Sequence, residues 1–203
     1  YSHKMVAWML FNRHPQQIAN LGLGSASLTK FGYQTFPDSV THVAEINPEV
    51  IAVCHSMFAL PPDNERLHVH LGNALDFVKQ AEYTGRFDIM HVDLYDAESR
   101  GPVLDTPEFY ADCHRCLKED GIMAVNLFGE VPSYSKNIKA IRQSFREVVP
   151  MSPIPEGNVI VLPFKKKPVI DWEHLDAEAT RIKGETSLPT RQWIKDFKKI
   201  WRK

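Results

Sequence analysis

Short apolar runs recur along most of the chain, and segments with helical spacing of apolar residues lie between them. A run that is apolar at nearly every position and bounded by turn residues is typical of a strand buried on both faces. The runs that predict such strands are Gln17–Leu23, His42–Ile46, Leu67–Leu71, Phe87–Asp93 and Ile122–Leu127.

The intervening segments predict helices. Pro48 and Pro107 fall where a first helical turn would begin, and a proline is tolerated there because its missing N–H would have no intrahelical partner. Strands that alternate with helices favour right-handed crossovers and a mostly parallel sheet. The predicted helices are His3–Asn12, Ser27–Phe36, Pro48–Phe58, Ala74–Gln80, Pro107–Leu117 and Ser135–Phe145.

The pattern changes after Ser144. Two strand-like segments, Glu147–Met151 and Asn158–Phe164, flank the turn-rich sequence SPIPEG and predict a closing antiparallel hairpin. The predicted fold class is therefore α/β, with a mostly parallel seven-stranded sheet, an antiparallel C-terminal hairpin and helices on both faces. Residues 1–164 would form this domain, and residues 165–203 would form a charged helical extension packed on it.

The sequence RQWIKDFKKIW, in the C-terminal extension, predicts a basic amphipathic helix. Its apolar face would carry Trp193, Ile194, Phe197, Ile200 and Trp201. Such a helix binds a membrane or a partner in some proteins and packs on its own domain in others. We favour packing on the domain, which is the commoner arrangement.

Composition narrows the class of protein. The chain has 203 residues, 43% of them hydrophobic, and a formal net charge of −1, which fits one soluble domain with a substantial core. A near-neutral chain offers no overall field for nucleic acid or for an anionic membrane. No apolar run approaches the roughly 20 residues of a membrane span, and no signal peptide is recognisable, so a cytoplasmic protein is expected. The start at Tyr1, without a methionine, predicts that a longer protein has been trimmed.

Cysteine and histidine spacing gives no metal site. Cys113 and Cys116 form a C-x-x-C pair within a predicted helix, but no second ligand pair completes the four ligands of structural zinc. His68 and His70 share one face of a strand without a third ligand nearby in the sequence. A structural role is expected for the cysteine pair, His68 and His70 are expected at the surface or at the edge of the crevice, and no metal is predicted.

A glycine-rich turn follows the first predicted strand, in the sequence NLGLGSASL. Gly22 and Gly24 let the backbone turn tightly and approach a ligand at the start of a helix. Glu45 ends the next strand, about 20 residues later, at the spacing where a carboxylate accepts both ribose hydroxyls of a bound nucleoside. Asn73 and Ala74 follow the third strand, where the Asn73 amide would either meet an adenine edge or cap the next helix.

Two carboxylates follow the fourth predicted strand, in the sequence HVDLYD. Asp93 and Asp96 would reach the same crevice, because the carboxyl ends of parallel strands meet at one edge of a sheet. Buried acids without partners are costly, so the pair is expected to meet a cation. This would suit attack by an amine on a sulfonium centre, in which the amine must be oriented and lose a proton. The alternative is that one of the two merely caps a loop or helix. Tyr95, between them, would stack on a cation, close over the nucleoside, or pack under the next loop.

Seven segments of the chain occur in the order, and at nearly the spacing, known from one family. They are NLGLGSASLTKF, VAEINPEVIAVCHSMFALP, LHVHLGNALDFVKQ, FDIMHVDLYD, GP, TPEFY and LKEDGIMAVNLFG. Over residues 2 to about 163 the chain resembles the spermidine synthases, which are polyamine aminopropyltransferases. The resemblance implies a class I methyltransferase-like Rossmann fold. It also implies a reaction in which decarboxylated S-adenosylmethionine donates its aminopropyl group to putrescine and methylthioadenosine is released.

The resemblance also implies roles for single residues. Glu45 would hold the ribose, Ile46 would pack on the adenine, and Asn73 with Ala74 would line the base pocket. His3, in SHKM, resembles the histidine of the family's YHEM sequence near the nucleoside.

On the acceptor side, Asp93 would take the catalytic position and accept the proton of the attacking amine, and Asp96 would bind the distal amine. Asn126 stands where the family has a glutamine that contacts the polyamine. Pro102, of the GP pair, would lie near the adenine.

Several positions depart from the family pattern. Gly24 stands where the family's glycine-rich loop carries an aspartate, whose charge favours the decarboxylated donor over intact S-adenosylmethionine. Ser2, Lys4 and Ile154 replace the tyrosine and glutamate of YHEM and the tyrosine of TYPSG. The family's N-terminal β-domain has no counterpart in this chain, which resembles a divergent spermidine synthase-like branch.

Three functions remain open at this stage: aminopropyl transfer to a di- or polyamine, methyl transfer from S-adenosylmethionine, and nucleoside binding without catalysis. The expected partners are a small amine and a nucleoside sulfonium, with neither nucleic acid nor a membrane. The family resemblance suggests a homodimer, although no stripe of residues in the sequence marks an interface.

Overall fold

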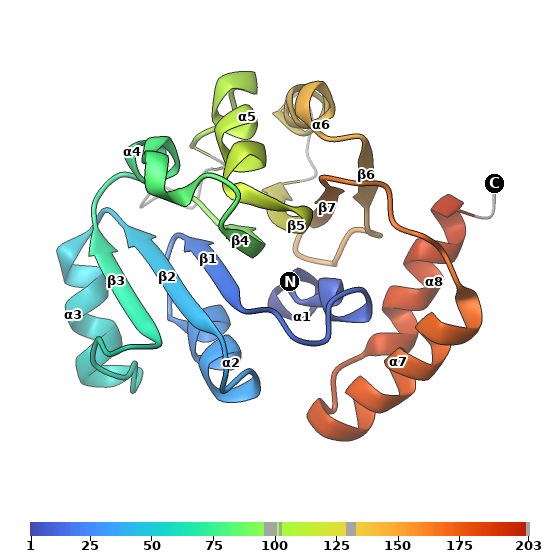
Figure 1. Cartoon of the computed structure of the whole chain (residues 1–203), viewed down its shortest axis with the longest axis horizontal. Helices are drawn as coiled ribbons and strands as arrows, with labels where there is room; N and C mark the ends of the chain where they lie inside the picture. The colour runs from blue at the N-terminus through green and yellow to red at the C-terminus, as the bar shows by residue number, and fades with distance from the viewer. Residues whose placement is uncertain (96–100, 102, 129–132, 202–203) are drawn as a thin grey trace.

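The computed structural model describes residues 1–95, 101, 103–128 and 133–201. Its seven-stranded sheet has the order β3-β2-β1-β4-β5-β7-β6, in which β7 runs antiparallel to both of its neighbours and the other pairings are parallel. The predicted parallel sheet with a C-terminal hairpin is confirmed (Figure 1). The strands are β1 Gln17–Leu21, β2 Val40–Glu45, β3 Leu67–Leu71, β4 Phe87–Val92, β5 Leu117–Phe128, β6 Glu147–Pro150 and β7 Asn158–Phe164.

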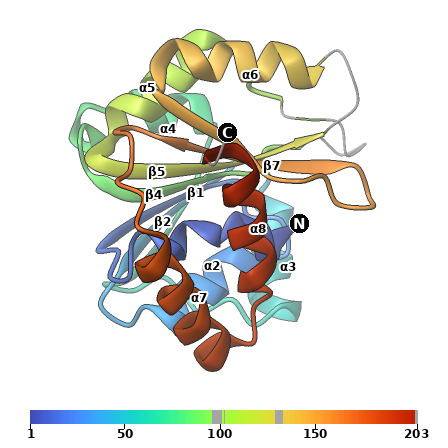
Figure 2. The same cartoon turned by 90° about the vertical axis from the view of Figure 1, so that its right-hand side faces the viewer.

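Helices cover both faces of the sheet (Figure 2). One face packs against α4, α5 and α6, and the other against the N-terminal turns, α2, α3, α7 and α8. The two layers bury apolar clusters on either side of the strands, and this burial supplies most of the driving force for folding. The helices are α1 Ser2–Met5, α2 Ser27–Thr35, α3 Pro48–Met57, α4 Ala74–Lys79, α5 Pro107–Cys116, α6 Ser133–Ser144, α7 Trp172–Thr186 and α8 Thr190–Trp201, with 3-10 turns η1 Ala7–Leu10 and η2 Ala81–Tyr83.

The N-terminal segment differs from its prediction. Instead of one helix over His3–Asn12, it forms two short turns, α1 and η1, with a break at Val6. Every side chain from Met5 to Leu10 is at most 3% exposed. A segment that is buried on all sides has no polar face to present to solvent. The spacing of its apolar residues therefore did not predict its secondary structure correctly.

A buried hydrogen-bond chain holds this segment against the sheet. Trp8 Nε1 donates to His91 Nε2 at 2.9 Å, and His91 Nδ1 donates to Asn20 Oδ1 at 2.7 Å. Asn20 Nδ2 in turn donates to Thr29 Oγ1 at 2.9 Å. The chain therefore connects η1, β4, β1 and α2, and every polar atom in it has a partner inside the core.

Strand β5 is longer than predicted. It begins at Leu117, where the sequence predicted the end of a helix, and Leu117 pairs with Phe87 of β4. The charged residues that follow Leu117 look like a turn in the sequence. The register of the β4–β5 pairing shifts between Phe87 and Ile89. This shift accommodates the charged residues, and the two strands pair on both sides of it.

The amphipathic C-terminal helix packs on its own domain. Trp193 and Phe197 are fully buried, Ile194 is 5% exposed, and the partly buried Ile200 and Trp201 pack against the same apolar cluster. None of the helices among the described residues is both long enough and apolar enough to span a bilayer.

A buried carboxylate connects this helix with the N-terminus and the segment after β6. Asp196 accepts hydrogen bonds from Lys4 Nζ at 3.0 Å, Ser152 Oγ at 2.6 Å and Gln192 Nε2 at 3.1 Å. Its side chain is 1% exposed and that of Lys4 is 12% exposed. Lys4, one of the departures from the family pattern, therefore has a structural partner in α8.

We expect Asp196→Asn to lower the free energy of unfolding by about 3 kcal/mol, because it leaves the Lys4 ammonium without its buried counter-ion. Asp176→Asn is the matched control. It breaks the exposed pair with Lys198, whose side chains are 26% and 53% exposed, and should cost less than about 1 kcal/mol. Urea denaturation of the two variants measures the difference, and equal small losses would show that the Asp196 charge is not required.

Candidate active site

A cleft of about 890 Å³ opens at the carboxyl edge of the parallel strands. Strands β1 to β5 run parallel, so their carboxyl ends meet there, and β7 begins at the same edge because Asn158 pairs with Phe128 at the end of β5. The residues that line the cleft are Tyr1, Gly22, Gly24, Ala44, Glu45, Ile46, Asn47, Val50, Gly72, Asn73, Ala74, Asp93, Leu94, Tyr95, Val103, Leu104, Asn126, Phe128, Glu156 and Asn158.

The glycine-rich turn and Glu45 form one unit. Gly22 has a φ of +93°, and an added Cβ would collide with the carbonyl oxygen of Asp93. Only glycine therefore fits where the turn passes the backbone of Asp93. Glu45 Oε2 accepts a hydrogen bond from Leu23 N at 2.9 Å, and Oε1 accepts one from Asn47 N at 2.9 Å. The carboxylate is thus fixed at the end of β2, and each oxygen keeps lone-pair capacity for a ligand.

The neighbouring strand ends provide an apolar side chain and an amide. Ile46 lines the cleft and is 67% exposed, so a flat apolar ligand group could cover it. Asn73 caps α4, since its Oδ1 accepts from Leu75 N at 2.8 Å. The two alternatives raised for Asn73 are compatible, because the cap uses the oxygen while Asn73 and Ala74 also line the cleft.

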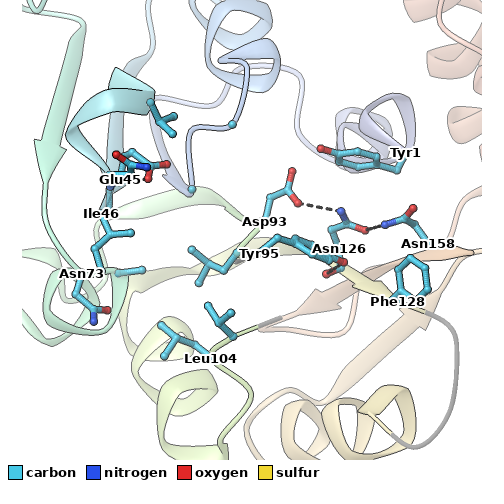
Figure 3. Close-up of a pocket in the computed structure, with 18 of the residues that line it drawn as sticks. Tyr1, Glu45, Ile46, Asn73, Asp93, Tyr95, Leu104, Asn126, Phe128 and Asn158 are labelled. Atoms are coloured by element: carbon cyan, nitrogen blue, oxygen red, sulfur yellow. Dashed lines mark hydrogen bonds between the residues drawn. The ribbon is translucent and has the colours of Figure 1, made fainter. Parts of the chain in front are cut away.

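Asp93 follows β4 in the middle of the cleft. Its Oδ1 accepts a hydrogen bond from Asn126 Nδ2 at 2.9 Å, and Asn126 Oδ1 accepts one from Asn158 Nδ2 at 2.9 Å (Figure 3). Burial raises the pKa of the Asp93 carboxyl above its usual value, although hydrogen bonds from Asn126 and Tyr1 hold it down in part. A half-buried carboxyl with a raised pKa is suited to accept and release a proton.

Aromatic side chains line the cleft on either side of Asn126. The Tyr95 hydroxyl donates to the Asn126 carbonyl oxygen at 3.2 Å, and burial, with the nearby Asp93 charge, raises the pKa of Tyr95 to about 12. Phe128 lies beyond Asn126, and Tyr1 lies across the cleft from it (Figure 3). Such rings can contact a cation through their faces.

Sequence reasoning missed several lining residues. Tyr1 lines the cleft near Asp93, one position before the serine that aligns with the family tyrosine, and the aromatic residue beside SHKM was the available signal. Glu156 lies in the β6–β7 connection and Asn158 begins β7, and both reach the cleft only through the antiparallel pairing of β7. Nothing in their local sequence indicated a site.

Of the predicted site residues that the structure describes, His3 alone does not line the cleft. His3 is exposed on α1 and is absent from the lining. Asp96 and Pro102 lie outside the described residues.

The remaining histidines and cysteines have structural surroundings. His68 and His70 lie beside His42, with ring centroids 4.8 Å and 5.5 Å from that of His42. Within the described residues there is no group of three side chains arranged to hold a metal. Cys113 and Cys116 are free and buried.

The site residues form a series along the sheet edge. Figure 3 shows Glu45, Ile46 and Asn73 at one end, Asp93 and Tyr95 in the middle, and Asn126, Phe128 and Asn158 at the other end. Among the described lining residues there is no lysine, arginine or histidine side chain, whereas Glu45, Asp93 and Glu156 are acidic. The cleft therefore favours ligands that carry positive charge.

Two solved structures share this fold. Human methyltransferase-like protein 13, in complex with SAH, has a TM-score of 0.73 at 20% identity, covering 94% of this chain and 91% of that chain. A spermidine synthase in complex with the transition state analogue AdoDATO has a TM-score of 0.69 at 18% identity, covering 92% and 75%. The predicted class I methyltransferase-like Rossmann fold is confirmed.

Sequence relatives identify the family. The model of the spermine/spermidine synthase domain matches residues 31–163. The polyamine aminopropyltransferase of Chromobacterium violaceum is 30% identical over 200 residues, which cover 98% of this chain and 76% of that protein. The polyamine aminopropyltransferase of Neisseria meningitidis serogroup A is 29% identical over 170 residues, and the match covers 83% of this chain and 64% of that protein. The chain belongs to the spermine/spermidine synthase family, and both of these relatives are transferases by name.

Proposed function

We propose that the chain transfers the aminopropyl group of decarboxylated S-adenosylmethionine to a di- or polyamine and releases methylthioadenosine. The observation that carries this proposal is the charge of the cleft. Its described lining contains three carboxylates and no cationic side chain, and both substrates of this reaction are cations.

The donor would occupy the end of the cleft formed by β1, β2 and β3. Glu45, held by the amides of Leu23 and Asn47, would accept the ribose hydroxyls. Ile46 would pack on the adenine, and the Asn73 amide would meet the edge of the base. The sulfonium would then lie toward the middle of the sheet edge, beside Asp93.

In the chemical step, the acceptor nitrogen attacks the aminopropyl carbon bonded to sulfur. The carbon–sulfur bond breaks, its electron pair stays on sulfur, and the neutral thioether leaves as methylthioadenosine. The nitrogen gains positive charge and must lose a proton, which the Asp93 carboxylate would accept. The hydrogen bond from Asn126 orients Asp93, and burial supports its basicity by raising its pKa.

Methyl transfer from intact S-adenosylmethionine is the second candidate, and Gly24 favours it. An added Cβ at Gly24 would meet no atom within 4 Å, so the position is open, and glycine supplies no charge there. Without an aspartate there, nothing at this position repels the carboxylate of the intact donor.

Product analysis distinguishes the two reactions. We expect methylthioadenosine from the decarboxylated donor and a panel of amines at saturating concentrations, and no S-adenosylhomocysteine from the intact donor with the same amines. S-Adenosylhomocysteine as the only product would select methyl transfer. Nucleoside binding without either product would select the non-catalytic alternative.

We expect Gly24→Asp to favour the decarboxylated donor over the intact donor by about a further tenfold in the ratio of dissociation constants, or ~1.4 kcal/mol. The new carboxylate would attract the aminopropyl ammonium and repel the carboxylate of the intact donor. Calorimetric titration with both donors measures the ratio. Gly24→Asn is the matched control, because it has the same shape and the same tolerance of the φ of +53° but no charge. An equal ratio in both variants would contradict the expected effect of charge.

A further inference from the structure

Glu156 is a carboxylate of the cleft to which the sequence gives no role. It lies in the connection between β6 and β7 and lines the same cleft as Asp93. No described residue forms a hydrogen bond or an ion pair with its side chain, which is exposed. By contrast, Glu45 is bound by two backbone amides and Asp93 by the Asn126 amide. Glu156 is therefore free to bind a ligand.

The local backbone holds Glu156 at this position. Ile154 N donates to Asn158 O at 3.0 Å, and Gly157 N donates to Ile154 O at 3.0 Å, which closes a tight turn around Glu156. Gly157 packs on the Phe128 ring, since an added Cβ would lie 3.3 Å from Phe128 Cζ. The turn is thereby fixed to the end of β5, and the Glu156 side chain is presented at the cleft.

The strand order separates Glu156 from Asp93. Asp93 follows β4, and Glu156 precedes β7, with β5 between them. Two strand spacings separate β4 from β7, so the backbone that follows β4 and the backbone that precedes β7 are roughly 10 Å apart. Asn126 and Phe128 belong to β5, the strand that lies between β4 and β7. Glu156 is thus on the far side of Asp93 from Glu45 and the glycine-rich turn.

We infer that Glu156 binds an ammonium group of the acceptor that is remote from the reacting nitrogen, an inference that rests on the proposed function. An acceptor whose reacting nitrogen lies at Asp93 would extend past Asn126 and the Phe128 ring, and its second positive charge would meet Glu156. The site then selects amines that carry at least two nitrogens separated by several carbon atoms. A monoamine gains nothing from Glu156.

The test compares n-butylamine with 1,4-diaminobutane, which have the same carbon chain and differ in the distal nitrogen. In Glu156→Gln, with the decarboxylated donor saturating, we expect KM for 1,4-diaminobutane to rise roughly threefold to fivefold, as for a partly exposed ion pair. KM for n-butylamine and kcat for both amines should change by less than twofold. Glu65→Gln, which removes an exposed carboxylate far from the cleft, should change neither KM.

Equal changes for both amines, or no change for either, would overturn the inference. A binding measurement separates this result from failure of the proposed reaction. Calorimetry in the presence of methylthioadenosine should show the diamine binding more tightly than n-butylamine to the parent chain, with the preference lost in Glu156→Gln. If no amine is turned over, that preference still supports the Glu156 site, and its absence overturns it.

Discussion

We expect Asp93→Asn to lower kcat of the proposed transfer by roughly 10²-fold to 10⁴-fold, the range typical of removing a general base. Asparagine has the shape of aspartate and can still accept the hydrogen bond from Asn126, so the cleft keeps its form. It cannot accept the proton of the attacking amine. Single-turnover formation of methylthioadenosine measures the loss, and donor binding by calorimetry should remain within a few-fold of the parent value.

The pH profile provides a second readout for Asp93. Because burial raises the pKa of its carboxyl, the acid limb of kcat/KM should lie above the usual aspartate range and should disappear in Asp93→Asn. Asp38→Asn, at an exposed position outside the cleft, is the control for removing one negative charge. Activity of Asp93→Asn within threefold of the parent would show that Asp93 is not the base.

We expect the free energy of unfolding to fall by several kcal/mol when the pH is lowered from 7 to 5. Burial lowers the pKa of His91 to about 4. It also lowers the pKa of His42 to about 4, with the charges of Arg86, His68 and His70 adding to the effect. Both values lie below the unfolded value of about 6.5, so the unfolded chain binds more protons as pH falls through this window. Stability is full above pH 6.5 and is lost toward pH 4, by about 2 kcal/mol per histidine at pH 5.

Urea denaturation at pH 7 and pH 5 measures this loss. In His42→Gln the difference between the two pH values should shrink by about 2 kcal/mol, because one of the two titrating groups is gone. His14→Gln, at an exposed position, should leave the difference unchanged. Unfolding free energies that are equal at the two pH values in the parent chain would contradict the account of both histidines.

The sheet was predictable because its strands are buried on both faces. Short, mostly apolar runs such as Phe87–Val92, between helical segments, leave little ambiguity. Where side chains are buried on every side, as from Met5 to Leu10, periodicity carries no information, and the predicted helix is two short turns. Leu117 was misplaced because tertiary pairing with Phe87 outweighed the local preference of the charged residues after it.

The part of the cleft that we propose binds the donor was predictable from the sequence, whereas much of the part that we propose binds the acceptor was not. Gly22, Glu45 and Asp93 each lie at the carboxyl end of a predicted parallel strand. Because the carboxyl ends of parallel strands meet at one edge of a sheet, the sequence alone predicts that the three residues share one cleft. Asn158 and Glu156 join them only because β7 runs antiparallel beside β5. That pairing depends on which strand the hairpin joins, and local sequence does not specify it.

The most direct test of the account is a crystal structure with methylthioadenosine and 1,4-diaminobutane. The account predicts the ribose hydroxyls on the Glu45 carboxylate, the adenine over Ile46, and one amine nitrogen within hydrogen-bond distance of Asp93 on the side toward Asn126. A nucleoside bound at the Phe128 end of the cleft, or an amine that avoids Asp93, would contradict it.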